Sequence, residues 1–173
     1  MSDRSQQMLC KALELAENAV DFYDATLASC AQGLGHDVFS QLKDDKVAHM
    51  NRLKEVHDNL AQGQTWIDAC LLPAEDAKDV SAAFKAMADK YDPTSCPASE
   101  EAALEKAISM EKAILAFYQE SQGQADDEVE KQFLVHIIGD VRNHTILLAD
   151  MQYYYEDPEA WARGEGRGGL DGA

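Results

Sequence analysis

The chain has few basic residues and no long apolar run. It carries 15 Lys and Arg against 32 Asp and Glu, which gives a formal net charge of -17. Nucleic-acid binding depends on clustered basic side chains that meet phosphates, so this balance excludes a nucleic-acid partner, and it also disfavours an anionic membrane surface. No apolar stretch approaches the roughly 20 residues of a membrane span. We therefore expect a protein with neither a nucleic-acid nor a membrane partner.

The four cysteines lack the spacing of metal and redox motifs. Cys10, Cys30, Cys70 and Cys96 include no Cys-x-x-Cys pair, so neither a zinc knuckle nor a dithiol motif is indicated. We interpret them as small buried hydrophobic residues. Residues 1–7 are polar and lack the apolar segment of a signal peptide, which predicts a cytoplasmic protein.

Helical periodicity dominates the chain. Almost no stretch alternates strictly between polar and apolar residues, and the sequence contains only four prolines. The pattern therefore predicts an all-α protein. Gly33 and Gly35 are expected to end the first helix and separate it from the second, and Ser99 is expected to be the N-cap of the third long helix. Four long helices are predicted at about residues 3–32, 37–62, 99–123 and 126–155, with a short one near 75–91.

The lengths of the connections predict the topology. Short links join the first two helices and the last two, whereas residues 64–98 form a long connection between the pairs. Two helical hairpins joined by one long crossover make a ferritin-like four-helix bundle. We assign residues 1–161 to this single domain and residues 162–173, which hold five of the ten glycines, to a flexible tail.

One carboxylate lies in the middle of an apolar helix face. At about 100° per residue, five apolar residues share that face with Glu111 near the centre of their arc: Ala107, Met110, Ile114, Phe117 and Tyr118. A charge buried alone costs several kcal/mol, roughly the effective desolvation penalty of one ion. A metal, a cation or a proton is therefore expected beside Glu111.

An internal repeat relates the two halves of the chain. A shift of 95 residues (144 − 49) aligns His49 with His144, Asp45 with Asp140 and Tyr23 with Tyr118, in one register without a gap. Such a repeat predicts a bundle with a pseudo-twofold axis. The axis should bring six positions toward one another: Ala16, Lys46, His49, Glu111, Val141 and His144.

With these residues identified, the sequence resembles the rubrerythrin-like branch of the ferritin-like di-iron carboxylate family. The resemblance rests on residues 110–114 (MEKAI) with Phe117-Tyr118, on the two histidines, on residues 51–54 (NRLK) and on residues 157–161 (DPEAW). It implies two irons held by four glutamates and two histidines, with peroxide-reducing or ferroxidase activity. It also implies a homodimer that pairs through outer helix faces, but it names no electron donor.

Half of the implied ligand set is replaced. Glu111, His49 and His144 stand as residual metal ligands, whereas three glutamate positions are occupied by Ala16, Lys46 and Val141. Each histidine is preceded at four residues, rather than three, by an aspartate. We expect Asp45 and Asp140 to orient the imidazoles or simply to be solvated, and not to reach a metal. Tyr23 and Tyr118 are expected as further polar residues around the ligands.

Lys46 is the most informative of these replacements. It lies near the centre of an apolar helix stripe, where an unpaired lysine is almost never found. We expect Glu111 as its partner, because an ammonium supplies positive charge to the carboxylate and repels other cations. The alternative is a lysine that extends along the bundle to solvent.

Three functions remain open at this point. The first is a di-iron oxidoreductase in which other ligands or water fill the replaced positions. The second is a bundle with one metal held by His49, His144 and Glu111. The third is a metal-free binding or assembly module stabilised by a Lys46–Glu111 pair.

Overall fold

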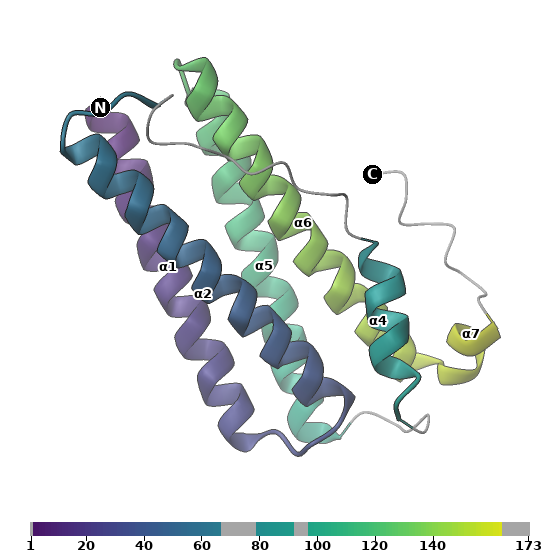
Figure 1. Ribbon diagram of the computed structural model, residues 1–173. Coiled ribbons are helices and arrows are strands. Elements are labelled where there is room, and N and C mark those ends of the chain that lie inside the picture. Colours follow the sequence, from purple (N-terminus) through teal and green to yellow (C-terminus); the bar gives the residue numbers. More distant parts are fainter. Residues whose placement is uncertain (1, 67–78, 92–96, 164–173) are drawn as a thin grey trace.

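The computed structural model is all-helical over the residues that it describes, which are 2–66, 79–91 and 97–163 (Figure 1). This confirms the predicted all-α class. Within those residues, no helix is long and apolar enough to cross a membrane. The helices are α1 (Asp3–Ser29), α2 (Leu34–Ala61), α4 (Val80–Ala88), α5 (Ala98–Gln124), α6 (Glu128–Glu156) and α7 (Pro158–Arg163).

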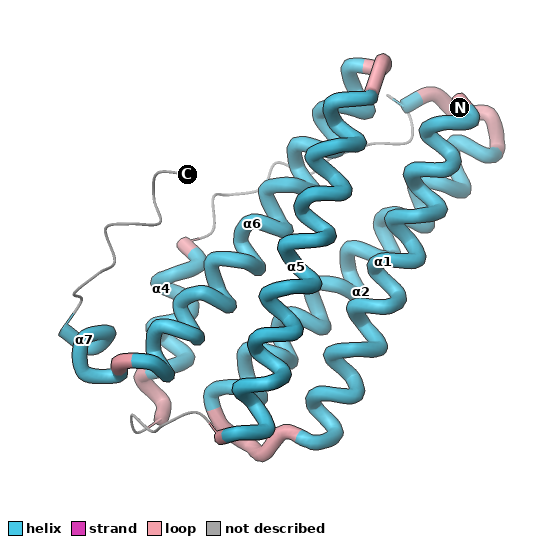
Figure 2. The backbone as a smooth tube through the Cα atoms, turned by 180° about the vertical axis from the view of Figure 1, so that it is seen from behind, coloured by secondary structure: helices cyan, strands magenta, loops and turns pink. Residues whose placement is uncertain are grey.

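The four long helices form two antiparallel pairs. Helix α1 packs along α2, and α5 packs along α6, and the view from behind in Figure 2 shows the same arrangement. The short helix α4 contacts α6 and α2, and α7 packs against α6. Much of the predicted connection between the pairs, at residues 67–78 and 92–96, lies outside the described residues, as does the tail from residue 164.

The apolar stripes of the helices bury two clusters of side chains. The first cluster contains side chains from the N-terminal halves of α1 and α6 and from the C-terminal halves of α2 and α5. The second cluster contains side chains from the opposite halves of these four helices. Three buried polar residues, Lys46, Glu111 and His144, each lie on their helix between the residues of the first cluster and those of the second. The antiparallel packing therefore places a polar layer across the middle of an otherwise apolar core.

Two residue roles predicted at helix starts were wrong. Gly35 does not break the chain but lies buried in the first turn of α2, because the backbone there packs directly against the Glu100 side chain. Ser99 is not the cap of α5, which begins at Ala98 after Pro97. The carbonyl of Pro97 accepts the backbone N–H groups of Glu100 and Glu101, and the fixed φ of proline suits the entry to a helix.

The interpretation of the cysteines as buried residues was also wrong where it is tested. Cys10 is exposed, since it follows the buried Leu9 and lies about 100° away from the core-facing stripe of α1. Cys30 is half-buried, and its Sγ lies 3.4 Å from Oε1 of Glu100. Cys70 and Cys96 fall outside the described residues.

Candidate functional site

An ion pair lies inside the bundle between α2 and α5. Nζ of Lys46 donates a hydrogen bond to Oε2 of Glu111 at 2.7 Å. Lys46 is 2% exposed and Glu111 is 0% exposed. The lysine therefore ends at the carboxylate instead of extending to solvent, and this contact confirms the pairing predicted from the sequence.

Tyr23 from α1 forms a hydrogen bond with the second carboxylate oxygen of Glu111. Its hydroxyl donates to Oε1 at 3.0 Å. Burial, and then the neighbouring carboxylate, raise the pKa of Tyr23 far above its usual value, so the hydroxyl remains a donor. Burial alone would raise the pKa of Glu111, but His144 and Lys46 outweigh it and lower that pKa to about 2. Glu111 is thus an ionised carboxylate with both oxygens engaged.

His144 connects α6 to two other helices. Its Nδ1 lies 3.6 Å from Oε2 of Glu111, and its Nε2 lies 3.6 Å from Oδ2 of Asp45. These distances describe ion-pair contacts, since they exceed ordinary hydrogen-bond lengths. Burial lowers the pKa of His144, but the contacts with Asp45 and Glu111 outweigh it and raise that pKa overall. A protonated imidazole carries a hydrogen on each nitrogen and can face both carboxylates.

His49 has a different environment from its repeat partner. Burial, and then the charge of Lys46, lower its pKa to about 3, so the imidazole is neutral at physiological pH. Its Nε2 lies 2.8 Å from the hydroxyl of Tyr118, which is 1% exposed and has no other hydrogen-bond partner within the described part of the chain. Because a buried hydroxyl must donate, Nε2 accepts and Nδ1 carries the hydrogen.

The replacement at position 16 explains this asymmetry. In the 95-residue repeat, Ala16 corresponds to Glu111 and Tyr118 corresponds to Tyr23. Tyr23 therefore has a carboxylate to bond, whereas the corresponding position for Tyr118 is an alanine, and Tyr118 bonds His49 instead. Ala16 and Val141 both lie buried in the first apolar cluster, so hydrocarbon occupies the places of two implied glutamates.

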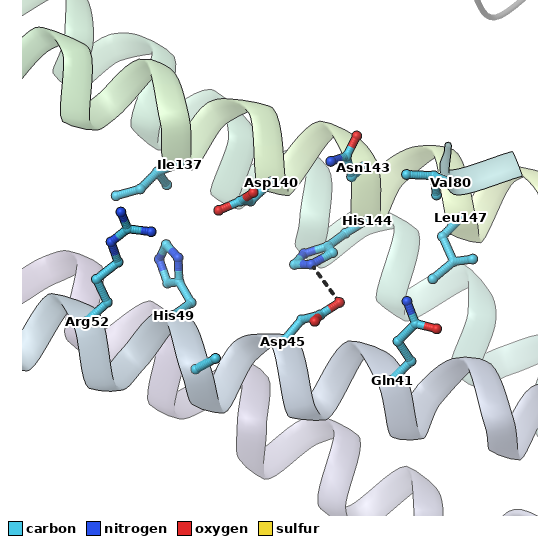
Figure 3. Close-up of a pocket in the computed structure, with 11 residues that line it drawn as sticks. Gln41, Asp45, His49, Arg52, Val80, Ile137, Asp140, Asn143, His144 and Leu147 are labelled. Carbon is cyan, nitrogen blue, oxygen red and sulfur yellow. Dashed lines mark ion pairs between the residues drawn. The ribbon is translucent and has the colours of Figure 1, made fainter. Parts of the chain in front are cut away.

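A pocket of about 180 Å³ lies between α2 and α6 beside the ion pair (Figure 3). Both repeated Asp-x-x-x-His pairs line it, Asp45 and His49 from α2 and Asp140 and His144 from α6, and the dashed line in Figure 3 marks the His144–Asp45 contact. The two histidines thus face one region, as the repeat predicts. The remaining lining residues are Gln41, Ala48, Arg52, Val80, Ile137, Asn143 and Leu147.

The residues present do not fit the metal that the resemblance implies. Across residues 2–66, 79–91 and 97–163, no group of three or more His, Cys, Asp or Glu side chains could hold a metal ion. The physical reason is that the donor atoms already face protein partners. Glu111 accepts from Tyr23 and Lys46, and Nε2 of His49 meets Tyr118.

Glu130 is a further buried carboxylate, which the sequence did not lead us to expect. Glu130 is 1% exposed, and its Oε2 accepts from Nη2 of Arg4 at 2.8 Å and from Oγ of Ser5 at 3.0 Å. The signal was present, because Glu130 precedes Leu134 and Ile137 at helical spacing on the face that α6 buries. Arg52, Gln41 and Asn143 were not predicted to line a pocket, since a groove between helices depends on side-chain packing.

Comparison of the chain with protein-family models, with curated proteins and with solved structures finds no match.

Proposed function

We propose that this chain is a ferritin-like bundle of rubrerythrin-like ancestry in which the Lys46–Glu111 ion pair occupies the place of the metal centre. It acts as a metal-free binding or assembly module and not as a di-iron oxidoreductase. The observation that carries this proposal is the 2.7 Å contact from Nζ of Lys46 to Oε2 of Glu111 inside the bundle. The two helix pairs, with α4 in the connection between them, support the ferritin-like crossover.

The charge of the six implied ligand positions supports this reading. Two irons bring a formal charge of about +4 to +6, which four glutamates offset in an intact site. Here Glu111 contributes one negative charge and Lys46 contributes one positive charge, so the formal sum is zero with His49 and His144 neutral. Protonation of His144 makes the sum positive. Neither state gives these six positions the negative charge that offsets two irons.

The hydrogen bonding supports it independently. A buried polar group is costly unless its partners are present, and a fully partnered network rigidifies the core around it. Lys46 and Tyr23 donate to the two oxygens of Glu111, and Tyr118 bonds His49. The bundle therefore supplies partners for most of this layer from its own side chains, and among the described residues Nδ1 of His144 has only the 3.6 Å contact with Glu111.

The direct test is metal analysis of protein purified without added iron, followed by peroxide consumption in the presence of ferrous ion. We expect far less than one metal per chain and no turnover beyond that of free iron. Two irons per chain with rapid peroxide turnover would establish the di-iron alternative. Binding of one metal per wild-type chain, with no metal bound in His49→Gln or in His144→Gln, would establish the mononuclear alternative.

A further inference from the structure

The polar layer lies at an interface between two helical hairpins. The first hairpin consists of α1 and α2 and the second of α5 and α6, and each pair of helices packs along its length (Figure 1). Lys46 of the first hairpin bonds Glu111 of the second, and His49 of the first bonds Tyr118 of the second. Tyr23 of the first hairpin also donates to Glu111. These hydrogen bonds therefore join one hairpin to the other.

The internal repeat makes each hairpin a possible partner for a copy of itself. With the shift of 95 residues, position 16 of the first hairpin corresponds to Glu111 of the second, and Lys46 corresponds to position 141. Ala16 and Val141 occupy these two positions, and both lie buried in the first apolar cluster. The two hairpins thus share an apolar face of the same design and differ in the charge at its centre.

This central charge distinguishes unlike pairs of hairpins from like pairs. In the observed, unlike pair, Lys46 faces Glu111. In a pair of two first hairpins, each Lys46 would face Ala16, so two ammonium groups would be buried without a carboxylate. In a pair of two second hairpins, each Glu111 would face Val141, so two carboxylates would be buried without a cation. Because a buried charge without a partner is strongly unfavourable, both like pairs are excluded.

An apolar pair at the same positions would not have this effect. Replacing a buried ion pair by hydrocarbon of similar volume is often neutral or stabilising, so Lys46 and Glu111 are not needed to hold the hairpins together. Hydrocarbon would, however, leave like and unlike pairs equally favourable. The ion pair therefore adds selectivity to the interface more than it adds affinity.

We propose that Lys46 and Glu111 are the specificity determinants of hairpin recognition, and that the partner that fits the first hairpin, besides the chain's own second hairpin, is the second hairpin of another copy. In such a dimer the copies exchange hairpins reciprocally, and each Lys46 meets Glu111 of the other copy. The inference rests on the proposed function, since it names the partner of the assembly module.

The length of the connection permits both arrangements. Residues 62–97 separate α2 from α5, and these 36 residues (97 − 62 + 1) span far more than one bundle at about 3.3 Å per extended residue. The chain's own hairpin is present at an effective concentration of about millimolar. The closed monomer therefore prevails in dilute solution, and exchange becomes visible when pairing within one chain is made unfavourable.

The test uses two full-length variants in a buffer that contains EDTA. Lys46→Glu would bury two carboxylates within one chain, and Glu111→Lys would bury two ammonium groups. When the variants are mixed, only exchange restores both pairs. The new glutamate of one chain then meets the new lysine of the other, while the remaining Lys46 meets the remaining Glu111.

The two variants are unfolded in urea, mixed at equal concentrations and diluted together. We expect a 1:1 complex with twice the mass of one chain by light scattering, and a Tm about 10 °C above that of either variant alone. This outcome does not require that either variant folds by itself. A mixture that forms no such complex, or that melts like its separate components, overturns the proposal.

Two controls separate recognition from other causes. A single chain with both Lys46→Glu and Glu111→Lys carries the pair reversed and should fold as a monomer; if it is as unstable as the single variants, neighbouring groups fix the sign of each charge and the proposal fails. Lys54→Glu and Glu17→Lys form the matched control, because Nζ of Lys54 lies 3.7 Å from Oε1 of Glu17 at exposed positions within the first hairpin.

The mixture of these control variants should remain monomeric with the Tm of wild type, because exchange cannot restore a pair that lies within one hairpin. A complex of doubled mass in this mixture would overturn the proposal. The chelator keeps both mixing experiments independent of metal. Their failure would therefore leave the metal-free reading to its own test, the metal analysis.

Discussion

Lys46 and Glu111 balance each other's charge where no water can do so. Removing one member of a buried ion pair leaves an uncompensated charge, whereas replacing both members by apolar groups of similar volume is often nearly neutral. Tyr23 also stabilises the ionised carboxylate of Glu111, because its hydroxyl donates a hydrogen bond to the other oxygen. A hydroxyl dipole, however, does not supply the missing unit of positive charge.

Lys46→Ala should therefore lower the free energy of unfolding by about 3–5 kcal/mol, the usual cost of leaving one buried partner unpaired. The double variant Lys46→Met with Glu111→Gln should lose much less, since neither side chain of the pair then carries a charge. Urea unfolding at neutral pH measures both. A double variant as unstable as Lys46→Ala would show that packing, and not charge, decides the stability of this site.

His144 should make stability depend on pH in a defined direction. Its pKa in the folded protein is raised above the usual 6.5, so its contribution is fully present below about pH 6.5 and is lost as the pH rises through the folded value. Glu111 remains ionised throughout this range, because its pKa is about 2. The destabilisation caused by His144→Gln should consequently be larger at pH 6 than at pH 9.

Asp45→Asn provides the matched comparison for this pH effect. It removes the carboxylate that lies 3.6 Å from Nε2 of His144 while keeping the shape of the side chain. In its background, the difference between pH 6 and pH 9 should shrink. A His144→Gln penalty that is equal at both pH values, or larger at pH 9, would contradict a protonated His144.

At the scale of single residues, the sequence could predict which charged side chains are buried in apolar helix faces, but not all of their hydrogen-bond partners. Glu111 and Lys46 each interrupt an apolar stripe, and their pairing follows because the repeat brings both positions together. Tyr23 and Tyr118 were expected near the ligand positions without assigned bonds. Their different partners depend on Ala16, which leaves Tyr118 without a carboxylate, and on the exact reach of each side chain across the bundle.

At the scale of helices, the start of α2 is fixed by its contact with the start of α5. Glu100 is 5% exposed and accepts a hydrogen bond from the hydroxyl of Tyr155 at 2.7 Å. A Cβ placed on Gly35 would fall on Oε2 of Glu100 and lie 2.7 Å from its Cδ and 3.2 Å from Cε of Met151. Glycine is required here for close approach, and its backbone is ordinary helix.

Gly35→Ala and Gly139→Ala should therefore have opposite effects. Alanine in a helix interior is favoured over glycine by roughly 0.5–1 kcal/mol, and at Gly139 nothing lies within 4 Å of the added methyl group. Gly139→Ala should be stabilising by that amount. At Gly35 the methyl group displaces a buried, hydrogen-bonded Glu100, so a net loss of about 1–3 kcal/mol is expected. Chemical unfolding of both variants tests this, and stabilisation by Gly35→Ala would refute the tight contact.

This contact also explains why the helix boundaries were predicted only approximately. Gly33 and Gly35 form a local pattern typical of a helix break, and only the position of Glu100 from α5 shows that the second glycine is helical. Ser99 is a common capping residue type, yet Pro97 already begins the helix. Local residue preferences are overridden at both places by what the neighbouring segment requires.

At the scale of the whole molecule, a polar layer divides an apolar core. The pairing of helices followed from link lengths and the repeat, because short links force antiparallel neighbours. The pocket could not be predicted in this way, since it depends on small or short side chains such as Ala48 leaving space between α2 and α6. The ion pair thus lies in this layer, and the pocket lies beside it.

The central claim is that Lys46 takes the place of the metal in this layer. The triple variant Ala16→Glu, Lys46→Glu and Val141→Glu would rebuild the six implied ligands around His49, His144 and Glu111. A metal that binds only the folded state stabilises it by about 2.7 kcal/mol at a hundred times its dissociation constant. The variant should therefore melt at a higher temperature when metal is added, whereas wild type should not.

Thermal unfolding of both proteins with and without ferrous or manganous ion is the measurement that tests this most directly. We expect no metal-induced rise in Tm for wild type and a clear rise for the triple variant. An equal rise in wild type would contradict the claim, because Lys46 would then not exclude the metal whose place it is proposed to take.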